Sequence, residues 1–201
     1  EKECLAARAR ALETNQDFRA AAADYHSVTV LDPRDADAFG QQGEAWRNAS
    51  ELARAQKCLD TSVQMNSNNP YARHCRGVLA LQKGELEIAL NDFDECIRLN
   101  RKLLERYEGS LTGDQAVHWT RLSLAHALDQ RGSVKYRMQD YPGASRDARE
   151  ALNLEFVTGE AHNILGRIAL ERADKANDAN AISHCYLGEL LVELALSKPL
   201  R

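Results

Sequence analysis

The feature that most constrains the fold of this chain is a set of residues that recur every 34 positions. Ala21, Ala55 and Ala89 form one such column. Further columns with the same step are, in chain order, Phe18, Leu52 and Leu86; Tyr25, Leu59 and Phe93; Leu31, Met65 and Leu99; and Gly43 and Gly77. Because several independent columns share one spacing, the chain is built from copies of a 34-residue unit.

The spacing increases once along the chain and then recovers. Gly77 is followed by Gly132, and Ala89 by Ala144, at steps of 55 residues, which exceed 34 by 21. Gly166 then follows Gly132 at the original step of 34. An insertion of 21 residues therefore separates the third copy from the fourth.

Each copy has the pattern of two helices separated by a break. Apolar residues recur at spacings of three and four almost throughout, and the chain has only four prolines, which is typical of α-helices. The breaks are "ETNQDF", "RNASEL", "LQKGEL" and "RMQDYP". Gly43, Gly77, Gly132 and Gly166 fall within the first helices, where Gly costs about 1 kcal/mol relative to Ala. Close approach of paired helices is a physical reason to keep glycine there.

This unit resembles the tetratricopeptide repeat (TPR), a 34-residue helix-turn-helix motif with small residues in both helices, an aromatic facing them and a Pro after the second helix. The resemblance implies an all-α, right-handed superhelical solenoid of antiparallel helix pairs. We expect about five repeats, with an elongated helix pair between repeats three and four. The chain departs from the pattern because only Pro33 occupies the terminal Pro position, and the large first-helix aromatic survives only as Phe39.

The repeats predict a single TPR-like domain over residues 1–201. Its units cover residues 2–35, 36–69, 70–100 and 125–158, with an insertion at 101–124 and a degenerate or capping unit at 159–197. We expect the second helix of repeat three to run to about Glu108 and the first helix of repeat four to begin near Asp114. The elongated pair would either pack on itself or offer a docking surface through residues such as Trp119.

The last helix is expected to begin near Ala181 and to carry a broad apolar face. That face consists of Ile182, Cys185, Leu187, Leu190, Leu191 and Leu194. Two interpretations stay open. The helix caps the last repeat and is buried on it, or it is an exposed seam for self-association, since a terminal solenoid unit normally needs a polar outer side.

Composition removes several classes of function. The formal net charge of −4 lacks the basic footprint of a nucleic-acid-binding protein. No apolar run of about 18 residues is present to span a bilayer. The five cysteines include no CxxC pair, so neither a disulfide framework nor a zinc site is expected, and a reducing cytoplasmic compartment fits the chain.

The sequence also lacks the motifs of common catalytic sites. It contains no GxxxxGK[ST] phosphate loop, GxGxxG fingerprint, HExxH pair or GxSxG elbow. His118 and His126 could share a helix face, but no third and fourth metal ligands accompany them. Carboxylates such as Asp92 and Glu95 are expected on solvated helix faces. We therefore predict that the chain is not an enzyme and holds no cofactor or metal.

The resemblance places partner binding on the first helices, which line the concave side of a TPR superhelix. Carried over by register, the candidate groove residues are Arg10, Gln41, Glu44, Arg47, Tyr71, His74, Val78, Leu81, Gln130, Tyr136, Arg137, Asn163 and Arg167. An apolar centre between Tyr71 and Leu81, surrounded by charged groups, suits a peptide or an amphipathic helix anchored by a few side chains. The alternative is a groove filled by the protein's own terminal helix.

The leading hypothesis is a non-catalytic adaptor or scaffold that binds a peptide or helical segment of another protein. A structural assembly domain, which oligomerises through the last helix or the insertion hairpin, is the first alternative. A co-chaperone that binds the C-terminal tails of Hsp70 or Hsp90 is the second. The family's carboxylate clamp uses Lys, Asn and Arg side chains at five groove positions, which here are Ala6, Arg10, Gln41, Tyr71 and Cys75. Only Arg10 could supply charge to a desolvated carboxylate.

Overall fold

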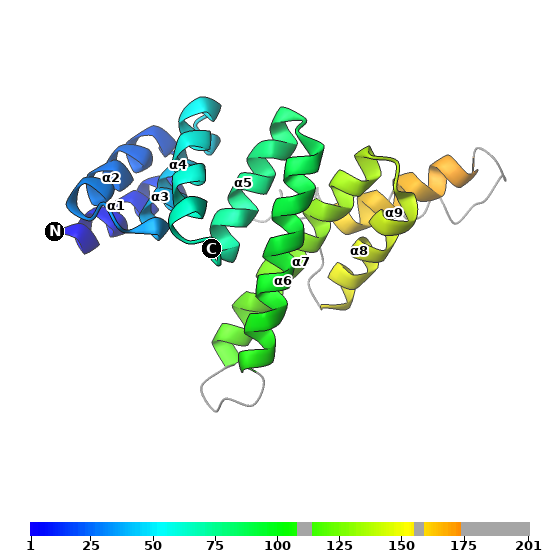
Figure 1. Ribbon diagram of the computed structural model, residues 1–201. Helices are drawn as coiled ribbons and strands as arrows, with labels where there is room; N and C mark the ends of the chain where they lie inside the picture. Colours follow the sequence, from blue (N-terminus) through cyan, green and yellow to red (C-terminus); the bar gives the residue numbers. More distant parts are fainter. Residues whose placement is uncertain (108–113, 155–158, 174–201) are drawn as a thin grey trace. The chain divides into compact units, whose positions relative to one another are not determined.

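The computed structural model describes residues 1–107, 114–154 and 159–173. Within these ranges the chain folds into α-helices joined by short turns, and no strand is present (Figure 1). None of the helices in these ranges is both long and apolar enough to cross a bilayer. The expected turn of the insertion at 108–113 and the expected last helix from Ala181 onward lie outside the described residues.

The described helices pack as two compact units, residues 1–99 and residues 100–201. The first unit contains α1 (Lys2–Thr14), α2 (Phe18–Leu31), α3 (Ala36–Asn48), α4 (Leu52–Met65), α5 (Pro70–Lys83) and the beginning of α6 (Leu86–Tyr107). These helices form repeats one to three, and each pair is separated at the break that the sequence predicts. With 22 residues, α6 is the lengthened second helix expected for repeat three.

The second unit contains the end of α6, then α7 (Asp114–Arg137), α8 (Tyr141–Asn153) and α9 (Gly159–Ala173). As predicted, α7 begins at Asp114, and its 24 residues make it the second elongated helix. It pairs with α8 to form repeat four, and α9 packs against both α7 and α8. That α9 begins a fifth unit stays a prediction. The all-α helix-pair architecture is confirmed, whereas the organisation as one domain stays a prediction.

The turn inside each helix pair has the same backbone conformation in all four complete repeats. Gln16, Ser50, Gly84 and Gln139 stand at matching register, and their φ angles are 61°, 63°, 79° and 64°. These values lie in the left-handed region, which glycine enters without steric cost and other residues enter at a cost. The repeat register thus fixes the turn geometry even where the residue is not glycine.

Short polar side chains begin many of the helices. The residues Asp17, Asp35, Asn69 and Asp140 accept hydrogen bonds from backbone N–H groups in the first turns of α2, α3, α5 and α8. Such caps satisfy donors that the helix itself leaves unpaired. Pro70 lies in the first turn of α5, where its missing N–H costs no hydrogen bond.

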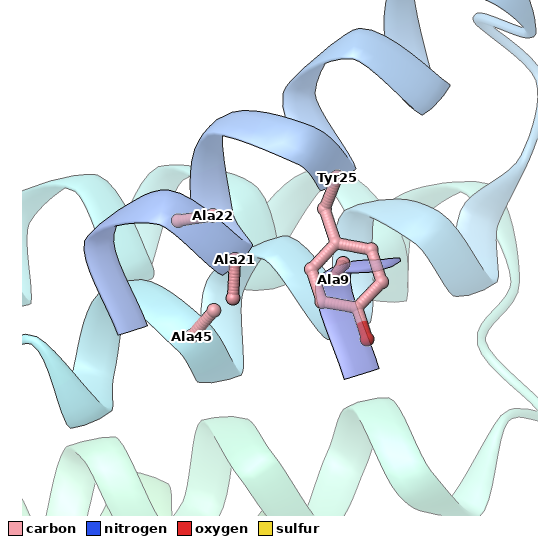
Figure 2. Packing of buried hydrophobic residues seen from close by; sticks show 5 residues of the cluster. All are labelled: Ala9, Ala21, Ala22, Tyr25 and Ala45. Carbon is pink, nitrogen blue, oxygen red and sulfur yellow. The ribbon is translucent and has the colours of Figure 1, made fainter. Parts of the chain in front are cut away.

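Small residues allow the two helices of a pair to approach closely, as predicted. A Cβ atom added at Gly43 would lie 2.6 Å from Cγ of Leu59, and one added at Gly77 would lie 2.9 Å from Cε1 of Phe93. The core of repeat one has the same character (Figure 2). There the alanines Ala9, Ala21 and Ala22 form one buried cluster with Tyr25 and with Ala45 of α3.

Ion pairs join the first and second helices in three of the four complete repeats. In each pair, Nε and Nη2 of an arginine donate to the two oxygens of an aspartate at 2.6–2.7 Å. The pairs are Arg8 with Asp24, Arg76 with Asp92, and Arg131 with Asp147, and the two residues of each pair are 16 positions apart.

The expected location of Asp92 on a solvated helix face is wrong. Asp92 is fully buried, and Arg73 donates to its Oδ1 at 2.9 Å in addition to the two hydrogen bonds from Arg76. Two guanidinium groups therefore replace the water that a carboxylate would otherwise need. Glu95 is half-buried and pairs with Arg98.

Candidate functional site

The candidate groove residues of the first unit lie on α1, α3 and α5, the first helices of repeats one to three. Tyr71 on α5 is 43% exposed although it carries a large ring. A Cβ atom added at Gly40 would lie 3.7 Å from Cδ1 of Tyr71, so the ring lies against a glycine of α3. Desolvation raises the pKa of the Tyr71 hydroxyl, and repulsion from Cys75 and Glu44 adds to the shift. Tyr71 is therefore an uncharged hydrogen-bonding group with an accessible ring.

The groove arginine of α3 is already bound by its own helix. Nε and Nη2 of Arg47 donate to the two carboxylate oxygens of Glu44 at 2.9 and 2.6 Å, and Nη2 also donates to Asn48. Burial is the largest single influence on Glu44 and favours its neutral form, but the hydrogen bonds and the positive charge of Arg47, with smaller contributions from Cys75 and His74, together hold the pKa of Glu44 below its ordinary value. The pair is thus a charged, pre-formed part of the groove wall.

A second carboxylate, on α1, lies close to this pair. Oε2 of Glu13 accepts a hydrogen bond from the Tyr25 hydroxyl at 3.1 Å. Burial raises the pKa of Glu13, and repulsion from Glu44 raises it further, while the hydrogen bond from Tyr25 opposes the shift. Repulsion from Glu13 also contributes to the raised pKa of Tyr71. Glu13, Glu44 and Tyr71 therefore belong to one neighbourhood, formed by the first helices of three consecutive repeats.

The remaining predicted groove residues of the first unit differ in their surroundings. The His74 ring lies edge-on to Phe93, with 5.9 Å between ring centroids, so it also contributes to packing within repeat three. Val78 and Leu81 are half-buried on α5, and Gln41 is half-buried on α3. Arg10 is exposed on α1.

In the second unit, the predicted residues of α7 and α9 form a separate cluster. The Arg167 guanidinium lies 4.4 Å from the ring centroid of Tyr136, a cation–π contact. The Tyr136 hydroxyl donates to Glu171, and this hydrogen bond raises the pKa of Tyr136. The ring of Tyr141 lies 5.5 Å from that of Tyr136. The other predicted residues here are half-buried Gln130, half-buried Asn163 and exposed Arg137.

The structure also contains a hollow that sequence reasoning missed. It has a volume of about 510 Å³ and lies in the first unit between α2, α3 and α4. Its lining consists of His26, Thr29, Val30, Phe39, Gln42, Trp46, Arg54, Lys57, Cys58 and Thr61. The signal that could have found it is the 34-residue register, because repeat two has Gln42 and Cys58 where its neighbours have an arginine paired with a buried aspartate.

Comparisons with known proteins support the fold through structure and not through sequence. No family model matches the chain, and no curated protein matches it. The structure is similar to that of MamA, with a TM-score of 0.68 and 16% identity over 94% of this chain and 97% of the other.

Two further similar structures are described as TPR proteins. One is the first TPR of Spaghetti (RPAP3) bound to the HSP90 peptide SRMEEVD, with a TM-score of 0.56 and 20% identity over 71% of this chain and 96% of the other. The other is YrrB, described as a TPR protein with an unusual peptide-binding site. It has a TM-score of 0.63 and 13% identity, over 94% of this chain and 90% of the other. These similarities confirm the TPR fold that the repeats predict.

Proposed function

We propose that this chain, which has the fold of tetratricopeptide-repeat proteins, is a non-catalytic adaptor that binds a segment of a partner protein on the first-helix face of its first unit. The observation that carries the proposal is the exposed ring of Tyr71 on α5, which lies against Gly40 of α3 and whose hydroxyl is acted on electrostatically by the carboxylates of Glu44 and Glu13. A large accessible ring beside fixed charges is the arrangement that anchors a short peptide segment.

The charges of this neighbourhood favour a partner segment with a basic residue. Arg47 is held by Glu44, whereas Glu13 accepts its hydrogen bond from the neutral hydroxyl of Tyr25. Arg10 of the same helix already attracts the Glu13 carboxylate. A Lys or Arg of the partner would add a second counter-charge in a half-buried setting, where a charge-assisted hydrogen bond is stronger than in water. We therefore propose a segment in which an apolar side chain contacts Tyr71 and a neighbouring basic side chain reaches Glu13.

The co-chaperone alternative is less well supported by the same charges. The RPAP3 structure holds the acidic peptide SRMEEVD. In this chain, Cys75 is buried and Ala6 carries no charge, and both replace cationic clamp residues of the family. Glu13 and Glu44 would repel an acidic tail. The assembly alternative depends on the last helix, which lies outside the described residues, or on the insertion hairpin, of which the turn at 108–113 lies outside them.

Site-specific photo-crosslinking tests the proposed surface. The amino acid p-benzoylphenylalanine is placed at position 71 or, as a matched control, at Ile88, which is 50% exposed on α6, a second helix. We expect covalent adducts with a partner protein from position 71 in cells of the source organism. Equal adducts from positions 71 and 88, or none from position 71, would show that the first-helix face is not the binding surface.

Two conservative variants then separate the contributions of ring and charge. Tyr71→Ala removes the accessible ring, and Glu13→Gln removes the charge while keeping nearly the same shape. We expect each to weaken capture of the crosslinked partner by about tenfold, the effect of losing one anchoring contact. An increase in capture by Glu13→Gln would instead favour an acidic partner segment and the co-chaperone alternative.

A further inference from the structure

The hollow between α2, α3 and α4 is an open pocket with an apolar interior. Phe39 and Trp46 of α3 line it together with Val30 of α2, which is 64% exposed. Its volume of about 510 Å³ falls within the range of roughly 300–1,000 Å³ that is typical of ligand-binding pockets. Its exposed rim leaves room for a chain that enters and leaves the pocket, as a protein segment does.

Three lining residues of the pocket stand at positions that form a bridge of ion pairs one repeat later. At the junction between repeats two and three, Arg76 of α5 donates to Asp92 of α6 and to Asp60 of α4, and so bridges the helices on both sides. The residues 34 positions earlier are His26, Gln42 and Cys58, and all three line the pocket. Gln42 and Cys58 are shorter than the pair they replace, so the equivalent space stays open.

The rim of the pocket is cationic. Arg54 and Lys57 line it, and none of the described lining residues is a carboxylate. The Arg54 guanidinium lies 4.7 Å from the ring centroid of Trp46. Within the described part of the chain, no carboxylate pairs with the side chain of Arg54 or of Lys57. A chain with a formal net charge of −4 thus presents a local positive rim around an apolar hollow.

We infer that this pocket is a second protein-binding site, which takes an apolar side chain of a partner segment flanked by Asp or Glu residues. The apolar side chain enters between Phe39 and Trp46, and the acidic neighbours pair with Arg54 and Lys57. Desolvated aromatic pockets with a charged rim are the usual anchoring points of short protein segments.

This site is separate from the proposed groove. At 3.6 residues per turn, Phe39, Gln42 and Trp46 share one face of α3, whereas Gly40, Glu44 and Arg47 lie on the opposite face. The two sites also differ in charge, since the groove contains the carboxylates of Glu13 and Glu44 beside its arginines, whereas the pocket is lined by cations and by no carboxylate. The inference therefore stands whether or not the groove binds a partner.

Short synthetic peptides test the inference directly. The chain has two tryptophans, so a Trp119→Phe variant leaves Trp46 as the sole indole and its emission reports on the pocket. Three capped five-residue peptides serve as probes: Phe flanked by two Glu on each side, Phe flanked by two Lys on each side, and Ala flanked by two Glu on each side. We expect the Glu–Phe peptide to bind about tenfold or more tightly than the other two.

Two variants provide matched controls, with binding measured by isothermal titration calorimetry. The double variant Gln42→Arg/Cys58→Asp introduces the ion pair of repeat three and fills the pocket, so we expect binding of the Glu–Phe peptide to fall about tenfold or more. Lys57→Glu changes an exposed side chain and leaves the core intact, and we expect it to reverse the preference towards the Lys–Phe peptide.

Three results would overturn the inference. The first is no saturable binding of the Glu–Phe peptide at millimolar concentration. The second is equal affinity for the Glu–Phe and Lys–Phe peptides, which would mean that the rim does not select charge. The third is unchanged affinity in Lys57→Glu, and this variant decides the question even if the double variant fails to fold.

Discussion

Repeats two and three have the same helix-pair backbone but differ at the junction with the preceding repeat, where matching positions form ion pairs in one repeat and line a pocket in the other. In repeat three, Arg76 fills the junction with the preceding repeat through ion pairs to Asp60 and Asp92. In repeat two, Gln42 stands at the position of Arg76, and the junction is a pocket with an apolar interior. Both repeats keep the close contact between a first-helix glycine and the second helix.

This difference shows which positions the fold needs and which it leaves free. Close packing of helices depends on small residues, since any added atom meets the facing helix. At the junction with the preceding repeat, the fold accommodates either the ion pairs of Arg76 or the pocket lined by Gln42 and Cys58. A repeat protein can therefore keep its architecture while one repeat changes from a structural junction to a binding surface.

The largest expected contrast between the two repeats comes from the buried aspartate. Asp92→Ala leaves the half-buried guanidinium groups of Arg73 and Arg76 without their shared acceptor. We expect the free energy of unfolding to fall by about 3–5 kcal/mol, as for other broken buried ion pairs. Cys58→Ala, at the matching position of repeat two, should cost about 1 kcal/mol or less. Urea unfolding followed by circular dichroism measures both, and equal losses would contradict the comparison.

The next prediction concerns a feature that the two repeats share, the close contact between a glycine of the first helix and the second helix. Gly43→Ala and Gly77→Ala would place Cβ atoms 2.6 Å from Leu59 and 2.9 Å from Phe93. We expect each variant to lose about 1–3 kcal/mol of unfolding free energy, despite the higher helix propensity of alanine.

A double-mutant cycle provides the control for this overpacking. In a Leu59→Ala background, the two closest contacts, with Cγ and Cδ2 of Leu59, are removed and only the contact of 3.2 Å with the backbone N of residue 59 is left, so most of the cost of Gly43→Ala should disappear. A cost that persists in that background would show that the glycine is needed for another reason.

A smaller effect is expected at the turn inside each pair. Ser50 of repeat two and Gly84 of repeat three have φ angles of 63° and 79°, and only glycine enters this region freely. We expect Ser50→Gly to stabilise the protein by about 0.5–1 kcal/mol and Gly84→Ser to destabilise it by a similar amount. Thermal unfolding of the two variants checks the prediction, and shifts of the same sign would refute it.

The smallest expected effect is a pH dependence that the aspartate at this repeat position supplies and that Cys58, its counterpart in repeat two, does not. Hydrogen bonds from Arg8 hold the pKa of Asp24 in repeat one below its ordinary value, so the folded state binds a proton less readily than the unfolded state. The stability from this pair is complete above the ordinary aspartate pKa and is lost as the pH falls towards the folded pKa. Asp24→Asn should therefore flatten the acid limb of a stability–pH curve. Cys58→Ala, at the matching position, should leave it unchanged.

The fold could be predicted from the sequence because it depends on regular spacing. The columns of Ala21 and Gly43 set the helix pairs, and the interruption of the register after Ala89 predicted two elongated helices. These patterns work because each one reports a local requirement, either helix periodicity or close packing, that the backbone meets in the same way in every repeat.

The chemistry of the site was less accessible from the sequence. Asp92 was expected on a solvated face because a lone carboxylate is costly to bury, and the arginine that offsets this cost lies 16 residues earlier, on the other helix. The pocket in repeat two is equally hard to predict, because it lies where Gln42 and Cys58 replace the arginine–aspartate ion pair of the neighbouring repeats. The sequence also does not show that the groove residue Arg47 is bound by Glu44, because this ion pair depends on the side-chain conformations of both residues.

The most direct test of the adaptor function is the chemistry of the partner residues that crosslink to position 71. Mass spectrometry of the adduct identifies the partner segment, and the Gln42→Arg/Cys58→Asp variant serves as a control in which the groove is intact. We predict a segment with an apolar residue next to a Lys or Arg, captured with equal yield by the control variant. An acidic segment at position 71, or loss of the adduct when only the pocket is filled, would contradict the proposed function.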